Sequence, residues 1–102
     1  MRVISLHRLR DFWEAGHADA ERPLRAWYKT AVRAEWRSLQ DVRADFAAAD
    51  GVGHGFDTLT VFNIAGRKYR LITRIRYDWR LVNVRTVLTH AEYNRGRWKE
   101  DA

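Results

Sequence analysis

Residues 66 to 80 read GRKYRLITRIRYDWR and alternate between two kinds of side chain. One set consists of Tyr69, Leu71, Thr73, Ile75 and Tyr77, and the other of Lys68, Arg70, Arg74 and Arg76, with Ile72 as its apolar member. Because successive side chains of a β-strand point to opposite faces, this period predicts a strand with one apolar and one cationic face. Solubility alone requires mixed charges rather than a row of cations, so the cationic face is expected to meet an anion.

Two further strands flank this one. Residues 58–64 (TLTVFNI) and 80–88 (RLVNVRTVL) have strand-like patterns, and the connections AGR and DW are short enough for hairpins. The three segments therefore predict an antiparallel meander. The glycine-rich GVGHG at residues 51–55 is the clearest break in the chain.

The first half of the chain is predicted to be mainly helical. After an opening strand at 1–4, Ser5 is expected to cap a helix over 6–16, and a second helix over 18–36 carries an apolar stripe. Ser38 is expected to cap a short third helix, and the tail from residue 89 is expected to hold one helical turn before it frays.

These elements predict a single α+β domain over residues 1–102, with N-terminal helices packed on one face of an antiparallel meander. The helices can cover only one face, so Arg70, Arg74 and Arg76 are expected on the open side. Arg85 and Asn63, from the neighbouring strands, are expected to join them in a basic concave surface.

The composition favours an anionic partner. The chain has 102 residues, a net charge of +6 and 19 basic residues, nearly all of them arginine. The planar guanidinium matches phosphate and carboxylate oxygens two at a time, which favours nucleic acid or an acidic protein. A GC-rich genome would also raise the arginine content, but it would not place arginines along one strand face. Cysteine is absent, and the sequence shows neither a membrane span nor a signal-peptide pattern, so we expect a cytoplasmic protein.

Several kinds of catalytic site are not supported. GVGHG follows a helix and precedes a strand, the reverse of a phosphate-binding loop. Asp50, His54 and Asp57 lack a recognised metal-ligand spacing, and no serine or threonine has an evident histidine and carboxylate beside it. We therefore expect no metal and no cofactor.

The sequence THAEY, residues 89–93, is the best candidate for proton chemistry. His90 can exchange protons near neutral pH, and Tyr93 follows one helical turn later. A lone histidine is more often an ordinary surface residue, but cations of the adjacent sheet strengthen the case. Cleavage of RNA through its 2′-hydroxyl needs proton carriers and cations rather than a metal or a thiol. Trp79 and Trp98 could stack on a base or meet a partner.

Four blocks of the sequence closely resemble the HigB toxins of bacterial type II toxin–antitoxin systems. They are LRDFWE, PLRAWYKTAVRAEW, VFNIAGRKYRLITRIRYD and VLTHAEY, and they occur in order over nearly the whole chain. The resemblance implies the small α+β fold of the RelE/ParE-like superfamily and a ribosome-dependent endonuclease that cuts mRNA codons in the A site. It also implies a HigA-like antitoxin with a helix-turn-helix.

The resemblance also suggests roles for single residues. Arg70 falls where RelE-like toxins keep a phosphate-binding arginine, and His90 matches a position of a catalytic Arg or His. Tyr93 belongs to the same catalytic block, and Asn63 stands where relatives often have a lysine. The residues expected to contact RNA are Asn63, Lys68, Arg74, Arg76 and Arg85.

Two other functions remain open at this point. A ParE-like protein would poison DNA gyrase, leave mRNA intact and have no nuclease chemistry. A non-catalytic RNA- or ribosome-binding module would need the arginines but not His90.

Overall fold

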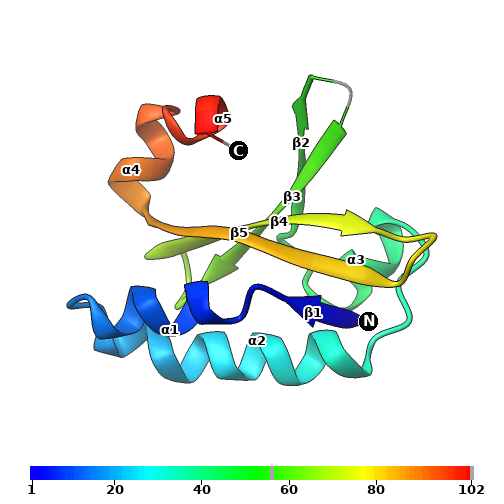
Figure 1. Cartoon of the computed structure of the whole chain (residues 1–102), viewed down its shortest axis with the longest axis horizontal. Coiled ribbons are helices and arrows are strands. Elements are labelled where there is room, and N and C mark those ends of the chain that lie inside the picture. The colour runs from blue at the N-terminus through cyan, green and yellow to red at the C-terminus, as the bar shows by residue number, and fades with distance from the viewer. Residues whose placement is uncertain (56, 102) are drawn as a thin grey trace.

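A computed structural model of the chain describes residues 1–55 and 57–101, with only the backbone described for His54 and Asp101 (Figure 1). The elements are β1 (Arg2–Ile4), α1 (His7–Glu14), the 3-10 turn η1 (Ala18–Ala20), α2 (Glu21–Arg33), α3 (Leu39–Asp45), β2 (Asp50–His54), β3 (Asp57–Ile64), β4 (Tyr69–Arg76), β5 (Leu81–Thr89), α4 (His90–Arg95) and α5 (Trp98–Asp101). The strand order is β1-β5-β4-β3-β2, with β1 parallel to β5 and the other pairs antiparallel. The predicted α+β fold and its meander are confirmed.

The N-terminal helices pack on one face of the sheet, as predicted. Leu24, Trp27 and Ala31 on α2 are buried in a core with Leu71 and Ile75 of β4. Among the described residues, no helix is long and apolar enough to span a membrane.

Helix starts were predicted with mixed success. The Ser38 hydroxyl accepts a hydrogen bond from the Asp41 amide and caps α3, as expected. The cap assigned to Ser5 is wrong, because α1 begins at His7 and its N-cap residue Leu6 makes no side-chain cap bond. Ser5 instead has a positive φ of 66°, where the chain turns from β1 into α1.

The predicted break at residues 51–55 is also wrong. Residues 50–54 form β2, an edge strand paired with β3. Gly51 allows neighbouring side chains to pack closely against the strand, since a Cβ on it would lie 3.3 Å from side-chain atoms of Leu39 and Thr58. Tight packing against α3, rather than a loop, accounts for a glycine at this point in the strand.

The sheet face expected to be open is partly covered. Leu59, Val61 and Ile72 form a second buried cluster with Trp98 of α5, and α4 and α5 lie on the side of the sheet opposite α1 and α2 (Figure 1). Trp98 is only 6% exposed, so the expectation that it is free to stack on a base is wrong. The tail contributes two short helices instead of a fraying turn because its apolar side chains bury this face.

The cations of β4 are divided between the two ends of the strand. Arg70 lies beside α4, whereas Arg74 pairs with Asp57 at 2.9 Å and Arg76 with Asp78 at 3.5 Å. The Arg76 guanidinium also lies 4.1 Å from the ring centroid of Trp79. Six residue steps along the strand separate Arg70 from Arg76 by roughly 20 Å, so the predicted row of cations does not form one continuous surface.

A small polar network ties η1 to the turn between β3 and β4. The Asp19 carboxylate accepts hydrogen bonds from the ammonium of Lys68 and from the Tyr69 hydroxyl, the latter at 2.6 Å. The bonds from Lys68 and then Tyr69 lower the pKa of Asp19 below its ordinary value. The same carboxylate raises the pKa of Lys68 and of Tyr69.

Trp98→Ala should lower the free energy of unfolding by about 3 kcal/mol, since it removes a large aromatic side chain from a buried cluster. Trp79→Ala is the matched control, because Trp79 is 65% exposed, and it should change stability by no more than about 0.5 kcal/mol. Urea denaturation of both variants measures the difference. Equal losses would contradict the second buried cluster.

Asp19→Asn should alter the pH dependence of stability. The pKa of Asp19 is lowered in the folded protein, so the ionised carboxylate stabilises the fold above about pH 4 and this contribution is lost as the pH falls further. The gap between wild type and Asp19→Asn, measured by denaturation, should be widest near neutral pH and close at acidic pH. Glu14→Gln, at the exposed last position of α1, should follow the wild-type curve.

Candidate functional site

Arg70, His90 and Tyr93 lie together where β4 begins and α4 packs against it. Arg70 is the second residue of β4 and lies opposite Leu88 on β5, directly before the turn into α4. The backbone amide of His90 donates to the Lys68 carbonyl at 3.0 Å and joins α4 to the β3–β4 turn. The three residues come from separate parts of the sequence, and strand pairing brings them into contact.

The Arg70 guanidinium is held on several sides by the protein. The side chain is buried, with 8% exposure. Its Nη1 donates to the Arg67 carbonyl at 2.5 Å, its Nη2 lies 3.3 Å from His90 Nδ1, and its centre lies 5.3 Å from the Tyr93 ring centroid. Arg70 therefore fixes the position of α4 on the sheet as well as contributing a charge.

The contact with Arg70 determines which His90 nitrogen carries hydrogen in the neutral ring. A guanidinium has donors and no acceptor, so Nδ1 must offer its lone pair to Arg70, and the hydrogen lies on Nε2. Nε2 lies 3.0 Å from the side-chain amide of Asn94, one helical turn along α4. That amide can accept the hydrogen through its oxygen if it turns over. His90 is exposed, so Nε2 is the ring atom available for exchange with a ligand.

The Tyr93 ring lies between the Arg70 guanidinium and the Trp98 ring. The Tyr93 ring stacks on Trp98 with centroids 5.2 Å apart and an interplanar angle of 16°. The Trp98 indole N–H donates to the Tyr93 carbonyl at 3.0 Å. Burial of Trp98 thus holds the ring that supports Arg70.

The start of α4 is fixed by a capping box. The Thr89 hydroxyl accepts from the Glu92 amide at 3.2 Å, and the Glu92 carboxylate accepts from the Thr89 amide at 2.9 Å. The helix ends at Gly96, which has a positive φ of 76°. These local signals set where α4 begins and ends.

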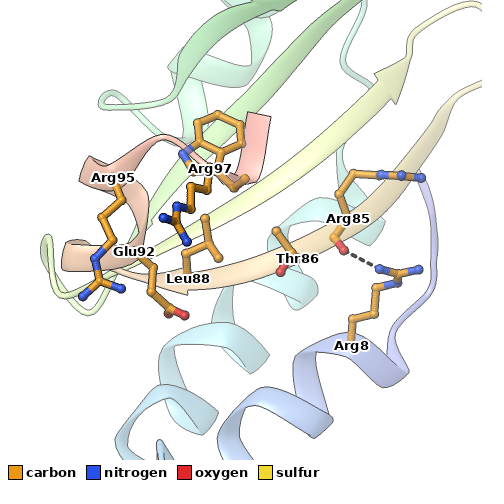
Figure 2. Close-up of a pocket in the computed structure, with 8 residues that line it drawn as sticks. Arg8, Arg85, Thr86, Leu88, Glu92, Arg95 and Arg97 are labelled. Carbon is orange, nitrogen blue, oxygen red and sulfur yellow. Dashed lines mark hydrogen bonds between the residues drawn. The ribbon is translucent and has the colours of Figure 1, made fainter. Parts of the chain in front are cut away.

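Arginines surround a groove of about 360 Å³ over β5, between α1 and the C-terminal helices. The residues around it are Arg8, Arg85, Thr86, Leu88, Glu92, Arg95, Arg97 and Trp98. Figure 2 shows Arg8 and Arg85 on the α1 side, with Arg95 and Arg97 on the α4 side. The Arg8 guanidinium donates to the Arg85 carbonyl at 2.6 Å. We call this feature the arginine groove.

The predicted RNA-binding residues occupy different places. Asn63 pairs with Arg70 in the β3–β4 register and lies on the same face. Arg85 lies in the arginine groove, where β5 has an irregularity opposite Ile72 and Thr73. Lys68 is held by Asp19, and Arg74 and Arg76 pair with carboxylates at the far end of the sheet. We call Arg70, His90 and Tyr93 the His90 cluster. The structure thus brings Asn63 near this cluster and leaves Arg74 and Arg76 apart from it.

Sequence reasoning did not single out Arg8, Arg95 and Arg97. Arg8 belongs to α1, and Arg95 and Arg97 to a tail that was expected to fray. The available signal was the capping box in THAEY with Gly96 after it, which marks an ordered helix that includes Arg95.

Among the described residues, no group of three His, Asp or Glu side chains is placed to hold a metal ion. The side chain of His54, considered with Asp50 and Asp57 as a metal site, lies outside the described residues.

Comparisons with known proteins place the chain in a family. Curated proteins give no match. A family profile described as HigB_toxin, RelE-like toxic component of a toxin-antitoxin system, matches residues 20–96. The match spans α2, the meander and α4, including Arg70, His90 and Tyr93. The chain therefore belongs to the HigB family of RelE-like toxins, the toxic components of toxin–antitoxin systems.

Proposed function

We propose that this toxin is a ribosome-dependent mRNA endonuclease that cuts codons in the A site. The reaction is metal-independent: the 2′-hydroxyl gives its proton to water, its oxygen bonds to the adjacent phosphorus, and the bond to the 5′-oxygen breaks. Its partner is a HigA-like antitoxin with a helix-turn-helix. Family membership supports the toxin role, and the reaction is inferred from the site.

The observation that carries this proposal is that one short helix serves both a cationic groove and an exposed imidazole. Glu92 and Arg95 of α4 line the arginine groove, while His90 and Tyr93 of the same helix meet Arg70. Guanidinium groups grip RNA phosphates. RNA held in the groove would therefore contact the same helix that carries the proton carrier.

In this proposal His90 delivers a proton from Nε2 to the leaving 5′-oxygen. To do so, the ring must hold hydrogen on both nitrogens, and Arg70 must give up its 3.3 Å contact with Nδ1. A bound phosphodiester favours that exchange, because it offers an anionic acceptor to both cations. Arg70 then stabilises the charge that grows on the phosphorane.

Ribosome dependence agrees with the character of the groove. Arginine side chains grip phosphates but do not by themselves fix a codon register. In the proposed mechanism the A site presents single-stranded mRNA in a fixed register, and the toxin adds charge and a proton carrier.

A second function is favoured by one observation. The Arg70 guanidinium is buried, and both nitrogens of His90 lie within hydrogen-bond distance of protein groups. This arrangement is also what a non-catalytic RNA- or ribosome-binding protein would have, with His90 serving only to attach α4. The two functions differ in whether His90 is needed for cleavage.

His90→Gln should slow cleavage by about a hundredfold or more while ribosome binding stays intact, because it removes a proton carrier and leaves the arginines of the groove in place. The measurements are mapping of mRNA 5′ ends after induction in bacteria and ribosome co-sedimentation of the same variants. His7→Gln, at an exposed position of α1, is the control and should cleave normally. Cleavage by His90→Gln at the wild-type rate would show that a group other than His90 delivers the proton. Intact mRNA with damaged chromosomes would indicate a gyrase poison.

Arg95→Gln with Arg97→Gln should weaken RNA binding uniformly across sequences and reduce the salt dependence. Each lost phosphate contact lowers the slope of log affinity against log salt by about one. Binding to single-stranded RNA is measured over a salt series. The control is Arg33→Gln with Arg37→Gln, which removes the same charge from exposed positions outside the groove. Equal slopes for the two double variants would contradict RNA binding in this groove.

A further inference from the structure

A second groove of about 270 Å³ lies between α1 and α2. Its base includes Leu9 and Leu24, which are 3% and 0% exposed, and its sides include the half-buried rings of Trp13 and Tyr28. The volume is below the roughly 300–1,000 Å³ of typical small-molecule sites. The groove is therefore better suited to side chains inserted from a protein partner.

The rim of this groove is cationic. Arg10 and Arg25 line it and are exposed, and His7 lies beside them. The Arg25 guanidinium lies 5.0 Å from the Trp13 ring centroid, and its Nε donates to Glu21 at 2.8 Å. Among the described residues that line the groove, none is a carboxylate. A partner that supplies carboxylates beside an apolar anchor would complement both features.

Apolar surface continues beyond the groove. Leu6 and Val32 are each 37% exposed and are two of the three large hydrophobic residues that the described chain exposes. Leu6 lines the groove, and Val32 lies one helical turn beyond Tyr28 on α2. Apolar patches with polar rims mark protein interaction sites.

We infer that the α1–α2 groove binds an acidic amphipathic segment of the antitoxin. Apolar side chains of that segment enter between Trp13 and Tyr28, and its carboxylates meet Arg10 and Arg25. The helices that line the groove, α1 and α2, lie on the face of the sheet opposite α4 and α5 (Figure 1), so the antitoxin can be anchored there without occupying the His90 cluster. The inference rests on the antitoxin partnership within the proposed function and does not require RNA cleavage.

The test compares two double charge reversals. Arg10→Glu with Arg25→Glu changes the rim, and Arg33→Glu with Arg37→Glu makes the same change at exposed positions outside the groove. Affinity for the purified antitoxin from the adjoining gene is measured by titration calorimetry, together with hydrogen exchange in α1 and α2 of the wild-type complex. The rim variant should bind at least tenfold more weakly than the control, and complex formation should protect α1 and α2.

Equal weakening of both variants would overturn the inference, since long-range charge alone would then explain it. Unchanged affinity of the rim variant, or unprotected α1 and α2, would overturn it as well. Growth arrest and mRNA cleavage are measured for each variant without antitoxin. Weaker antitoxin binding by the rim variant supports this inference even when no mRNA cleavage is found. Failure of the inference is therefore distinguishable from failure of the proposed reaction.

Discussion

The buried guanidinium of Arg70 connects the sheet to the helix that carries the candidate site. It bonds to the β3–β4 turn through the Arg67 carbonyl, contacts His90 Nδ1 and lies over the Tyr93 ring. A charge with 8% exposure is costly unless donors on several sides find partners. Because these partners lie on two elements, satisfying Arg70 requires α4 to rest in one place. The position of His90, and of the groove beside it, follows from that requirement.

The two faces of the sheet have different tasks. The face toward α1 and α2 holds the main core, with Phe62, Leu71 and Val84 among its buried residues. The other face holds a smaller cluster that closes only when Trp98 packs on it. Anchoring α4 and α5 through that cluster leaves arginines from the tail and from α1 on either side of β5. The toxin thus builds a cationic surface from short elements that a small apolar cluster holds in place.

Much of the fold was predictable because it depends on local patterns. Alternation in β4, short hairpin connections and the Ser38 cap each depend on neighbouring residues, and each was confirmed. The errors arose where a residue's partner is distant in sequence. The glycines at 51–55 were predicted to break the chain, but residues 50–54 form a strand that pairs with β3. The cations of β4 were predicted to lie on an open face, but Trp98 packs on part of that face.

The sequence by itself determined the meander, the helical first half and the residue types suited to phosphate and proton chemistry. It also marked Arg70, His90 and Tyr93, which the structure brings into contact. Only the tertiary structure decided that Arg70 is buried, that Arg74 and Arg76 lie apart from it, and that Arg8, Arg95 and Arg97 share a groove. The reason is physical: periodicity fixes which face of an element a side chain occupies, whereas its exposure and its partners depend on which distant segment packs against that face.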